Sequence, residues 1–105
     1  MDEYRNTQDV YDIEEIKRRL TPVFENHGVR RAVLFGSYAR GEARPVSDVD
    51  ILVDSGLRGM AFYGFGYEVS EALQKEIDLV DVREVIMNSR IDREIANTGV
   101  HIYGS

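Results

Sequence analysis

The segment Leu34-Phe-Gly-Ser-Tyr-Ala-Arg-Gly41 and, shortly after it, the segment Ser47-Asp-Val-Asp-Ile-Leu-Val53 decide how this sequence can fold. Each contains a short apolar run, which is typical of a buried strand. We expect one strand over Arg31–Phe35, broken by Gly36-Ser37 and followed by one helical turn before Gly41. We expect a second strand over residues 48–53, with polar and apolar residues alternating at its start.

The sequence before the first strand predicts an amphipathic helix, because its apolar residues recur at spacings of three and four. Pro22 predicts a kink, or a fresh helical turn starting near Thr21, since proline lacks a backbone donor and clashes with the preceding turn. His27-Gly28 predicts the end of this helix, because glycine can adopt the left-handed cap conformation. The apolar residues of the pattern are Val10, Ile13, Ile16, Leu20, Val23 and Phe24.

The remaining sequence predicts a helix over about 60–73, a strand over 77–82, a helix over 83–96 and a last short strand over 100–103. The connection between the first two strands is too short for a crossover helix, so we expect them to be antiparallel neighbours. The longer helical connection allows the second and third strands to run parallel. These features predict an α/β fold with a small mixed sheet of three to four strands covered by helices.

Length and composition limit the classes of protein to consider. The chain has 105 residues, which suits one domain, and we expect a flexible N-terminus over 1–8 and a single domain over 9–105. Its formal net charge of −6 argues against direct nucleic-acid binding, which depends on Lys and Arg. No segment approaches the length of apolar sequence that spans a bilayer. The chain has no cysteine, which excludes disulfides and thiolate metal sites and is consistent with a cytoplasmic protein.

Gly36 and Ser37 form a candidate phosphate-binding turn at the end of the first strand. Glycine allows a ligand to approach the backbone closely. The two amides and the Ser37 hydroxyl are all hydrogen-bond donors, and before a helical turn they can bind an anion. Arg40, at the end of that turn, can contact a phosphate or pair with a carboxylate, and the sequence leaves both roles open. Ser47 is expected to orient the loop before Asp48.

Asp48, Asp50 and Asp78 are candidate metal ligands. Residues two apart on a strand face the same side, so Asp48 and Asp50 place two like charges together, and a divalent cation relieves their repulsion. Asp78 lies in an apolar strand, where burial is costly unless the carboxylate is paired or binds a metal, and the expected sheet can place it beside Asp50. An edge-strand charge that discourages aggregation is the other reading of Asp78. Asp81 is expected to face the opposite side.

The spacing Gly36-Ser37, ten residues, then Asp48-x-Asp50 resembles the signature of minimal nucleotidyltransferases in the DNA polymerase β-like superfamily. The resemblance extends from about residue 12 to 98 and places Asp78 at the third metal-binding aspartate. It implies a polymerase β-like nucleotidyltransferase fold, phosphate binding by Gly36 and Ser37, and two Mg²⁺ ions held by Asp48, Asp50 and Asp78. Two such ions would stabilise the attacking and leaving oxygens of an in-line displacement.

Many members of this size resemble the antitoxins of HEPN–MNT toxin–antitoxin pairs. That resemblance implies transfer of AMP from ATP to a tyrosine of a partner HEPN ribonuclease toxin. Two alternatives stay open. The chain can be a non-catalytic binding module that neutralises a toxin by steric blockade, or a small-molecule nucleotidyltransferase that needs a partner subunit.

Four aromatic residues lie close together in the sequence and are expected to have two different roles: Phe62, Tyr63, Phe65 and Tyr67. We expect two of these residues to lie in the core and the others to form a partner-binding surface. Exposed aromatic residues would also suit a homodimer. His27 and His101 are expected to be surface or packing residues, because neither has a candidate partner nearby in the sequence.

Overall fold

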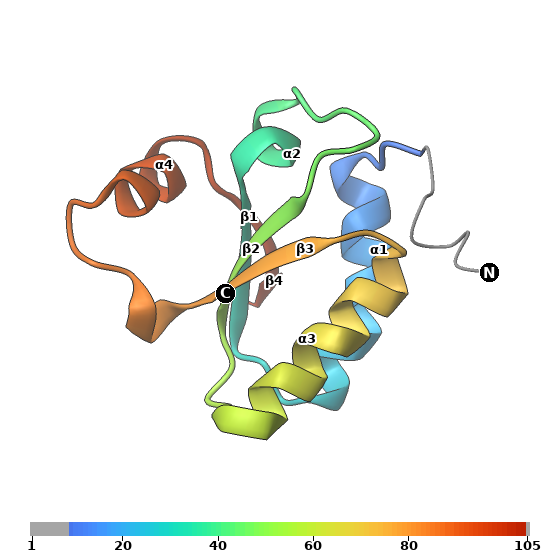
Figure 1. Cartoon of the computed structure of the whole chain (residues 1–105), viewed down its shortest axis with the longest axis vertical. Coiled ribbons are helices and arrows are strands. Elements are labelled where there is room, and N and C mark those ends of the chain that lie inside the picture. Colours follow the sequence, from blue (N-terminus) through green and yellow to red (C-terminus); the bar gives the residue numbers. More distant parts are fainter. Residues whose placement is uncertain (1–8, 105) are drawn as a thin grey trace.

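A four-stranded mixed sheet organises the chain and carries helices on both faces (Figure 1). The computed structural model describes residues 9–104. The sheet has the spatial order β3-β2-β1-β4, in which β1 pairs antiparallel with β2 and β4, and β2 pairs parallel with β3. This confirms the predicted mixed sheet and strand directions. The strands are β1 (Arg31–Phe35), β2 (Val49–Asp54), β3 (Ile77–Asp81) and β4 (Val100–Gly104).

Helix α1 (Ile13–Asn26) is the predicted amphipathic helix. It begins after Asp12, whose side chain accepts a hydrogen bond from the Glu15 amide at 2.8 Å. It ends at His27, before Gly28 with a φ of +68°, as predicted. The helix continues through Pro22, so of the two predicted outcomes the fresh helical turn near Thr21 is not formed. Leu20 and Phe24 are fully buried on either side of exposed Pro22, so core packing anchors the helix both before and after the proline.

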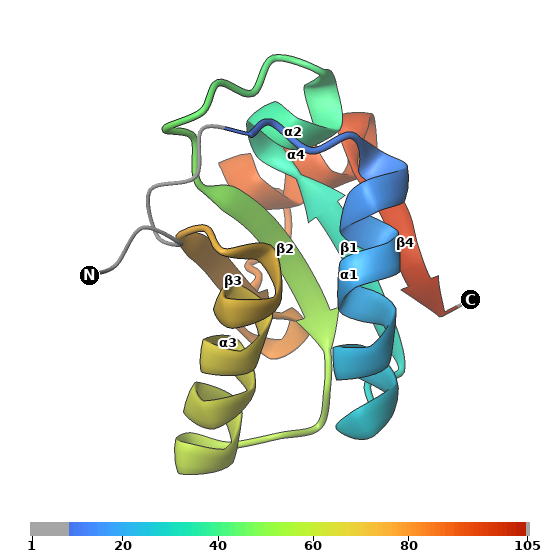
Figure 2. The same cartoon turned by 90° about the vertical axis from the view of Figure 1, so that its right-hand side faces the viewer.

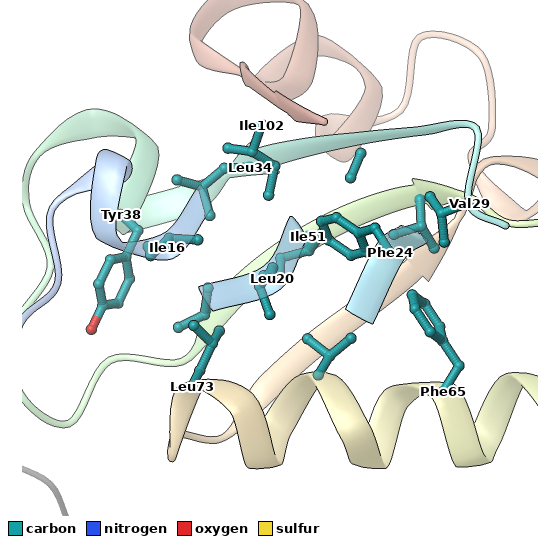
Figure 3. Close-up of a cluster of buried hydrophobic side chains, with 14 residues drawn as sticks. Ile16, Leu20, Phe24, Val29, Leu34, Tyr38, Ile51, Phe65, Leu73 and Ile102 are labelled. Carbon is teal, nitrogen blue, oxygen red and sulfur yellow. The ribbon is translucent and has the colours of Figure 1, made fainter. Parts of the chain in front are cut away.

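Helices α1 and α3 (Gly59–Leu73) cover one face of the sheet (Figure 2). Phe65 lies in the core between them, 6.1 Å from Phe24 between ring centroids (Figure 3). Phe62 packs on this core, whereas Tyr63 and Tyr67 are exposed, so the predicted division of the aromatic cluster is confirmed for burial. The fully buried side chains of this core are Ile16, Leu20, Phe24, Leu34, Ile51, Phe65 and Leu73, with valines of β2 and α3.

The opposite face of the sheet is covered by α4 (Arg90–Thr98), on the other side of the sheet from α1 and α3 in Figure 1. Ile91 and Ile95 of this helix pack against a smaller buried cluster. The predicted helix over 83–96 was wrong in its first half, where a single 3-10 turn, η2 (Val82–Glu84), is followed by a loop. Asn88 has a left-handed φ of +64°, and Ser89 then caps a new helix by accepting from the Asp92 amide.

The described helices lie on the sheet and do not suit a bilayer. Among residues 9–104, no helix is both long enough and apolar enough to cross a membrane.

Replacement of Phe65 by alanine tests the assignment of the core. We expect Phe65→Ala to lower the free energy of unfolding by about 3–5 kcal/mol, because it removes a fully buried ring. Tyr63→Ala on the same helix is the matched control, since Tyr63 is 77% exposed, and it should change stability by less than about 0.5 kcal/mol. Urea unfolding followed by circular dichroism measures both values. Equal losses for the two variants would contradict this assignment.

Candidate functional site

Three carboxylates lie at one end of the sheet, on the face that α4 covers. Asp50 and Asp78 are direct partners in the parallel ladder between β2 and β3. Leu52 and Val80, two residues further along each strand, pack in the cluster beneath α4, so Asp50 and Asp78 face the same side. Asp48 directly precedes β2. The sheet register therefore confirms the prediction that Asp78 lies beside Asp50.

Gly36 lies directly against the carboxylate of Asp50. It starts the short helix α2 (Gly36–Arg40) at the end of β1, where Phe35 and Asp50 are strand partners. Its φ is +74°, and a Cβ at this position would lie 2.0 Å from Asp50 Oδ2. Only a residue without a side chain fits there. The turn therefore brings the backbone of Gly36 and Ser37 next to the carboxylate.

The loop that leads into Asp48 is fixed at two points. Ser47 Oγ accepts a hydrogen bond from the Arg44 amide at 2.9 Å, which confirms the expected orienting role of Ser47. Lys75, a buried residue, donates from Nζ to the carbonyl of Pro45 at 3.0 Å. Burial lowers the pKa of Lys75, and its amine ties this loop to the turn before β3. Asp48 itself is exposed at the end of the fixed loop.

An open cleft of about 520 Å³ joins the turn, the start of β2 and helix α4. It contains five of the predicted site residues and adds two that the sequence analysis did not identify, Arg90 and Glu94 of α4. Asp78 is not among its lining residues. The lining residues are Gly36, Ser37, Arg40, Ser47, Asp48, Asp50, Arg90 and Glu94.

Arg40 is held by two carboxylates in the cleft. Its Nε donates to Glu42 Oε1 at 3.0 Å, and its Nη1 donates to Glu94 Oε2. These contacts raise the pKa of Arg40, chiefly through the hydrogen bond to Glu42. Of the two roles that the sequence left open, the structure shows the ion pair. This pair joins α2 to α4.

Asp78 lies beside Asp50, as expected, and it stands on an edge strand, as the alternative reading of this residue requires. Its side chain is exposed, because β3 is an edge strand, so the predicted cost of burial does not apply. Its charge nevertheless acts on Asp50. Asp81 lies on the opposite side of β3, as predicted, where it is buried and caps η2 by accepting from the Arg83 amide at 2.8 Å.

Asp50 is the most strongly perturbed carboxyl of the cleft. Burial, reinforced by the charges of Asp78, Asp48 and Glu94 and opposed by Arg40, raises its pKa to about 6. Neighbouring like charges and partial desolvation both disfavour the ionised form. The cleft thus holds negative charge that a cation would neutralise.

The donor set fits a hard divalent cation, because it consists of carboxylate oxygens alone. The carboxylates do not form a closed cage: among residues 9–104, no three acidic or histidine side chains converge as a metal site. Mg²⁺ is usually bound by one or two carboxylates together with substrate phosphates, so a cage is not required. Asp48, Asp50 and Asp78 are the side chains that would hold it.

Arg90 and Glu94 had only a weak signal in the sequence. Ser89, followed by Asp92 three residues later, marks a helix start, and residues four apart on a helix share a face. A helix start at Ser89 would have placed Arg90 and Glu94 together. Their approach to Asp50 depends on tertiary packing, which the sequence pattern does not encode.

Comparison with known proteins gives three findings. The family described as "Polymerase beta, Nucleotidyltransferase" matches residues 18–105. "Protein adenylyltransferase MntA" of Thermococcus cleftensis is 39% identical over 84 residues, covering 76% of this chain and 73% of that protein. A crystal structure of a toxin–antitoxin with AMP-PNP superimposes with a TM-score of 0.72 at 24% identity, covering 85% of this chain and 73% of that chain.

A further solved structure contains a tri-AMPylated Shewanella oneidensis HEPN toxin in complex with an MNT antitoxin. It superimposes with a TM-score of 0.67 at 21% identity, covering 89% of this chain and 73% of that chain. At these identities the two solved structures show a shared fold. The predicted polymerase β-like fold is confirmed.

Gly36→Ala tests the contact between the turn and Asp50. Gly41→Ala is a matched control, because Gly41 flanks the other end of α2 with the same φ of +74° and has no neighbouring atom within 4 Å of an added Cβ. Both variants carry the same backbone strain, but only Gly36→Ala displaces the carboxylate. We expect it to be about 1–3 kcal/mol less stable than Gly41→Ala in urea unfolding. Equal stabilities would show that Asp50 does not need this space.

Asp50→Asn tests the repulsion in the cleft. The pKa of Asp50 is about 6 in the folded protein and 3.8 when unperturbed. Ionisation of Asp50 therefore lowers the stability of the fold as the pH rises between these two values, and the loss is complete above pH 6. In the absence of divalent metal, we expect the variant to be more stable than the parent at pH 8, by about 1 kcal/mol after allowance for solvent screening. The difference should shrink as the pH falls from 6 to 4.

Thermal unfolding at several pH values, with EDTA present, measures this difference. Added Mg²⁺ should stabilise the parent at pH 8 more than the variant. A stability difference that does not depend on pH would contradict the assigned pKa shift.

Proposed function

The chain belongs to the polymerase beta nucleotidyltransferase family, and from this premise we propose that it transfers AMP from ATP to a protein acceptor, a tyrosine of a partner HEPN toxin, and so acts as an antitoxin. Its relatives include a protein adenylyltransferase at 39% identity, which supports a protein acceptor. We also propose that residues 9–105 work as a single catalytic domain.

The observation that carries this proposal is the pairing of Asp50 with Asp78 across β2 and β3, beside Gly36. Like charges on neighbouring strands contribute nothing to packing and oppose folding. Nucleotidyl transfer gives them a use, since it depends on positioning and on neutralising phosphate charge. We assign Asp48, Asp50 and Asp78 to the metal and Gly36 and Ser37 to the phosphates.

The transfer joins the acceptor oxygen to the α-phosphorus of ATP. The bond from that phosphorus to the oxygen of the β-phosphate breaks, and pyrophosphate leaves. Mg²⁺, when bound, would neutralise charge on the attacking and leaving oxygens. Asp48 and Asp50 would hold the metal at the start of β2, and the backbone donors of Gly36 and Ser37 orient the phosphates. The proton of the acceptor hydroxyl passes to water, which reaches the open cleft. No side chain has to serve as a covalent nucleophile.

A partner protein is proposed because the cleft is open and leaves room for an acceptor that another protein supplies. In one solved structure, the HEPN toxin of Shewanella oneidensis is AMPylated and is in complex with an MNT antitoxin. The present chain shares the fold of the matched chain in that complex. Tyr63 and Tyr67 are exposed on α3, and Met60 lies on the same helix with 83% exposure. Exposed apolar groups of this kind suit a protein interface.

Steric blockade is the alternative, and one observation favours it: the exposed side chains of Met60, Tyr63 and Tyr67 on α3 suit a partner interface that needs no chemistry. A binding module needs no catalytic cleft. It should therefore silence its partner equally well without Asp48 and Asp50.

Substitution of Asp48→Asn and Asp50→Asn together tests the proposal. With ATP labelled at the α-phosphate, Mg²⁺ and the HEPN-like product of a neighbouring gene, we expect the parent to label the partner. The double variant should lose at least about 99% of this transfer, because the groups that neutralise transition-state charge are removed. Peptide mass spectrometry should place the AMP on tyrosine.

Asp54→Asn is the matched control, since Asp54 ends the same strand but pairs with Arg30 at 2.9 Å outside the cleft. It should retain transfer. If the double variant labels the partner as the parent does, the assigned mechanism is wrong. If the parent transfers no label and the double variant still silences the toxin, blockade is correct.

A further inference from the structure

Among residues 9–104, Arg90 is the cleft arginine whose side chain has no bonded partner, and we propose that it binds the phosphate tail of the nucleotide. The Arg40–Glu94 ion pair then positions the helix that carries Arg90. This inference rests on the proposed function, because it assigns a ligand to the nucleotide site. Arg90 belongs to α4, outside the segments that resemble the family signature.

Helix α4 is placed by its own sequence and by the sheet. Ser89 caps its start, and Asp92 Oδ2 accepts from the Asn88 amide at 2.8 Å, which fixes the turn before the helix. Ile91 and Ile95 pack against Val33, Phe35 and Leu52 on the sheet. The residue before each isoleucine, Arg90 and Glu94, lies on the side of the helix that borders the cleft.

Arg40 is poorly suited to bind phosphate. Its guanidinium already donates to Glu42 and Glu94, so two carboxylates offset its single charge. A triphosphate brought to Arg40 would also approach both of those carboxylates. Recruitment of Arg40 would have to break at least one of its ion pairs.

Arg90 has no such constraint. Its side chain is exposed and, within residues 9–104, forms no ion pair or hydrogen bond. Its planar group presents several donors in a geometry that matches phosphate oxygens. In the part of the chain that the structure describes, the cleft lining holds two arginines and three carboxylates, and Arg90 is the arginine whose charge is not already offset by a bonded partner.

The ion pair between Arg40 and Glu94 gives Arg40 a positioning role. It connects α2, which starts at the Gly36 turn, to α4, which carries Arg90. Without the ion pair, α4 would be held to the sheet by the contacts of Ile91 and Ile95, and its side that borders the cleft would no longer be bonded to α2. The spacing between the turn and Arg90 would then be less defined.

Isothermal titration with Mg²⁺ and AMP-PNP tests this assignment on the full chain. We expect Arg90→Gln to weaken binding by roughly 10- to 100-fold, the range for loss of a hydrogen bond to a charged group. Arg90→Lys should fall between this variant and the parent, because lysine keeps the charge but lacks the planar fork. Circular dichroism should show both variants folded.

Arg93→Gln is the matched control, since it removes the same charge from the same helix at a residue that does not line the cleft. It should bind within about twofold of the parent. If Arg90→Gln binds as tightly as the parent, or if Arg93→Gln is weakened as much, the inference is wrong while the proposed function stands. If the parent itself binds no Mg²⁺–nucleotide complex, the proposed function fails and the inference falls with it.

A charge swap tests the positioning role. Arg40→Glu alone should weaken binding, whereas Arg40→Glu combined with Glu94→Arg should recover most of the affinity, because the ion pair is rebuilt in reverse. A direct phosphate contact from Arg40 would not be recovered by the swap. Failure of the double variant to recover would therefore contradict the positioning role.

Discussion

The contact between Gly36 and the carboxylate of Asp50 is the constraint on which the site depends. A Cβ at position 36 would lie 2.0 Å from Asp50 Oδ2, so the residue that follows β1 has to be glycine where the chain passes this carboxylate. The positive φ of the same residue turns the chain into α2. One residue therefore makes room for Asp50, ends the strand and brings the backbone donors of the turn to the cleft.

The site opposes the stability of the fold that carries it. Asp50 is partly buried near two other aspartates, and its pKa of about 6 reflects the free energy spent in keeping it ionised at neutral pH. The large core between α1, α3 and the sheet lies on the opposite face and contains none of these charges. Because the two faces are separate, the face with the large core stabilises the domain while the face with Asp50 carries the repulsion between carboxylates. This separation follows from the alternation of side chains along β2.

Local sequence patterns predicted the strands and the pairing of Asp50 with Asp78, because both depend on alternation and on the length of connections. Two local features depend on tertiary position. Pro22 does not interrupt α1, since buried Leu20 and Phe24 hold the helix, and Asp78 is exposed, since β3 lies at the sheet edge. Tertiary position overrode local preference in both cases. The late start of α4 could have been predicted from Asn88-Ser89, whereas the approach of Arg90 to the cleft could not.

Charge balance explains why the proposed nucleotide and metal would occupy this cleft together. The lining holds more carboxylates than arginines, and one of those arginines is already paired, so a bare triphosphate would meet repulsion near Asp48 and Asp50. A metal alone would find no closed cage among the described residues. Each supplies what the other lacks, because Mg²⁺ brings positive charge and phosphate oxygens complete its coordination. The site is therefore suited to bind the two together, and an acidic chain can use an anionic substrate without a basic surface.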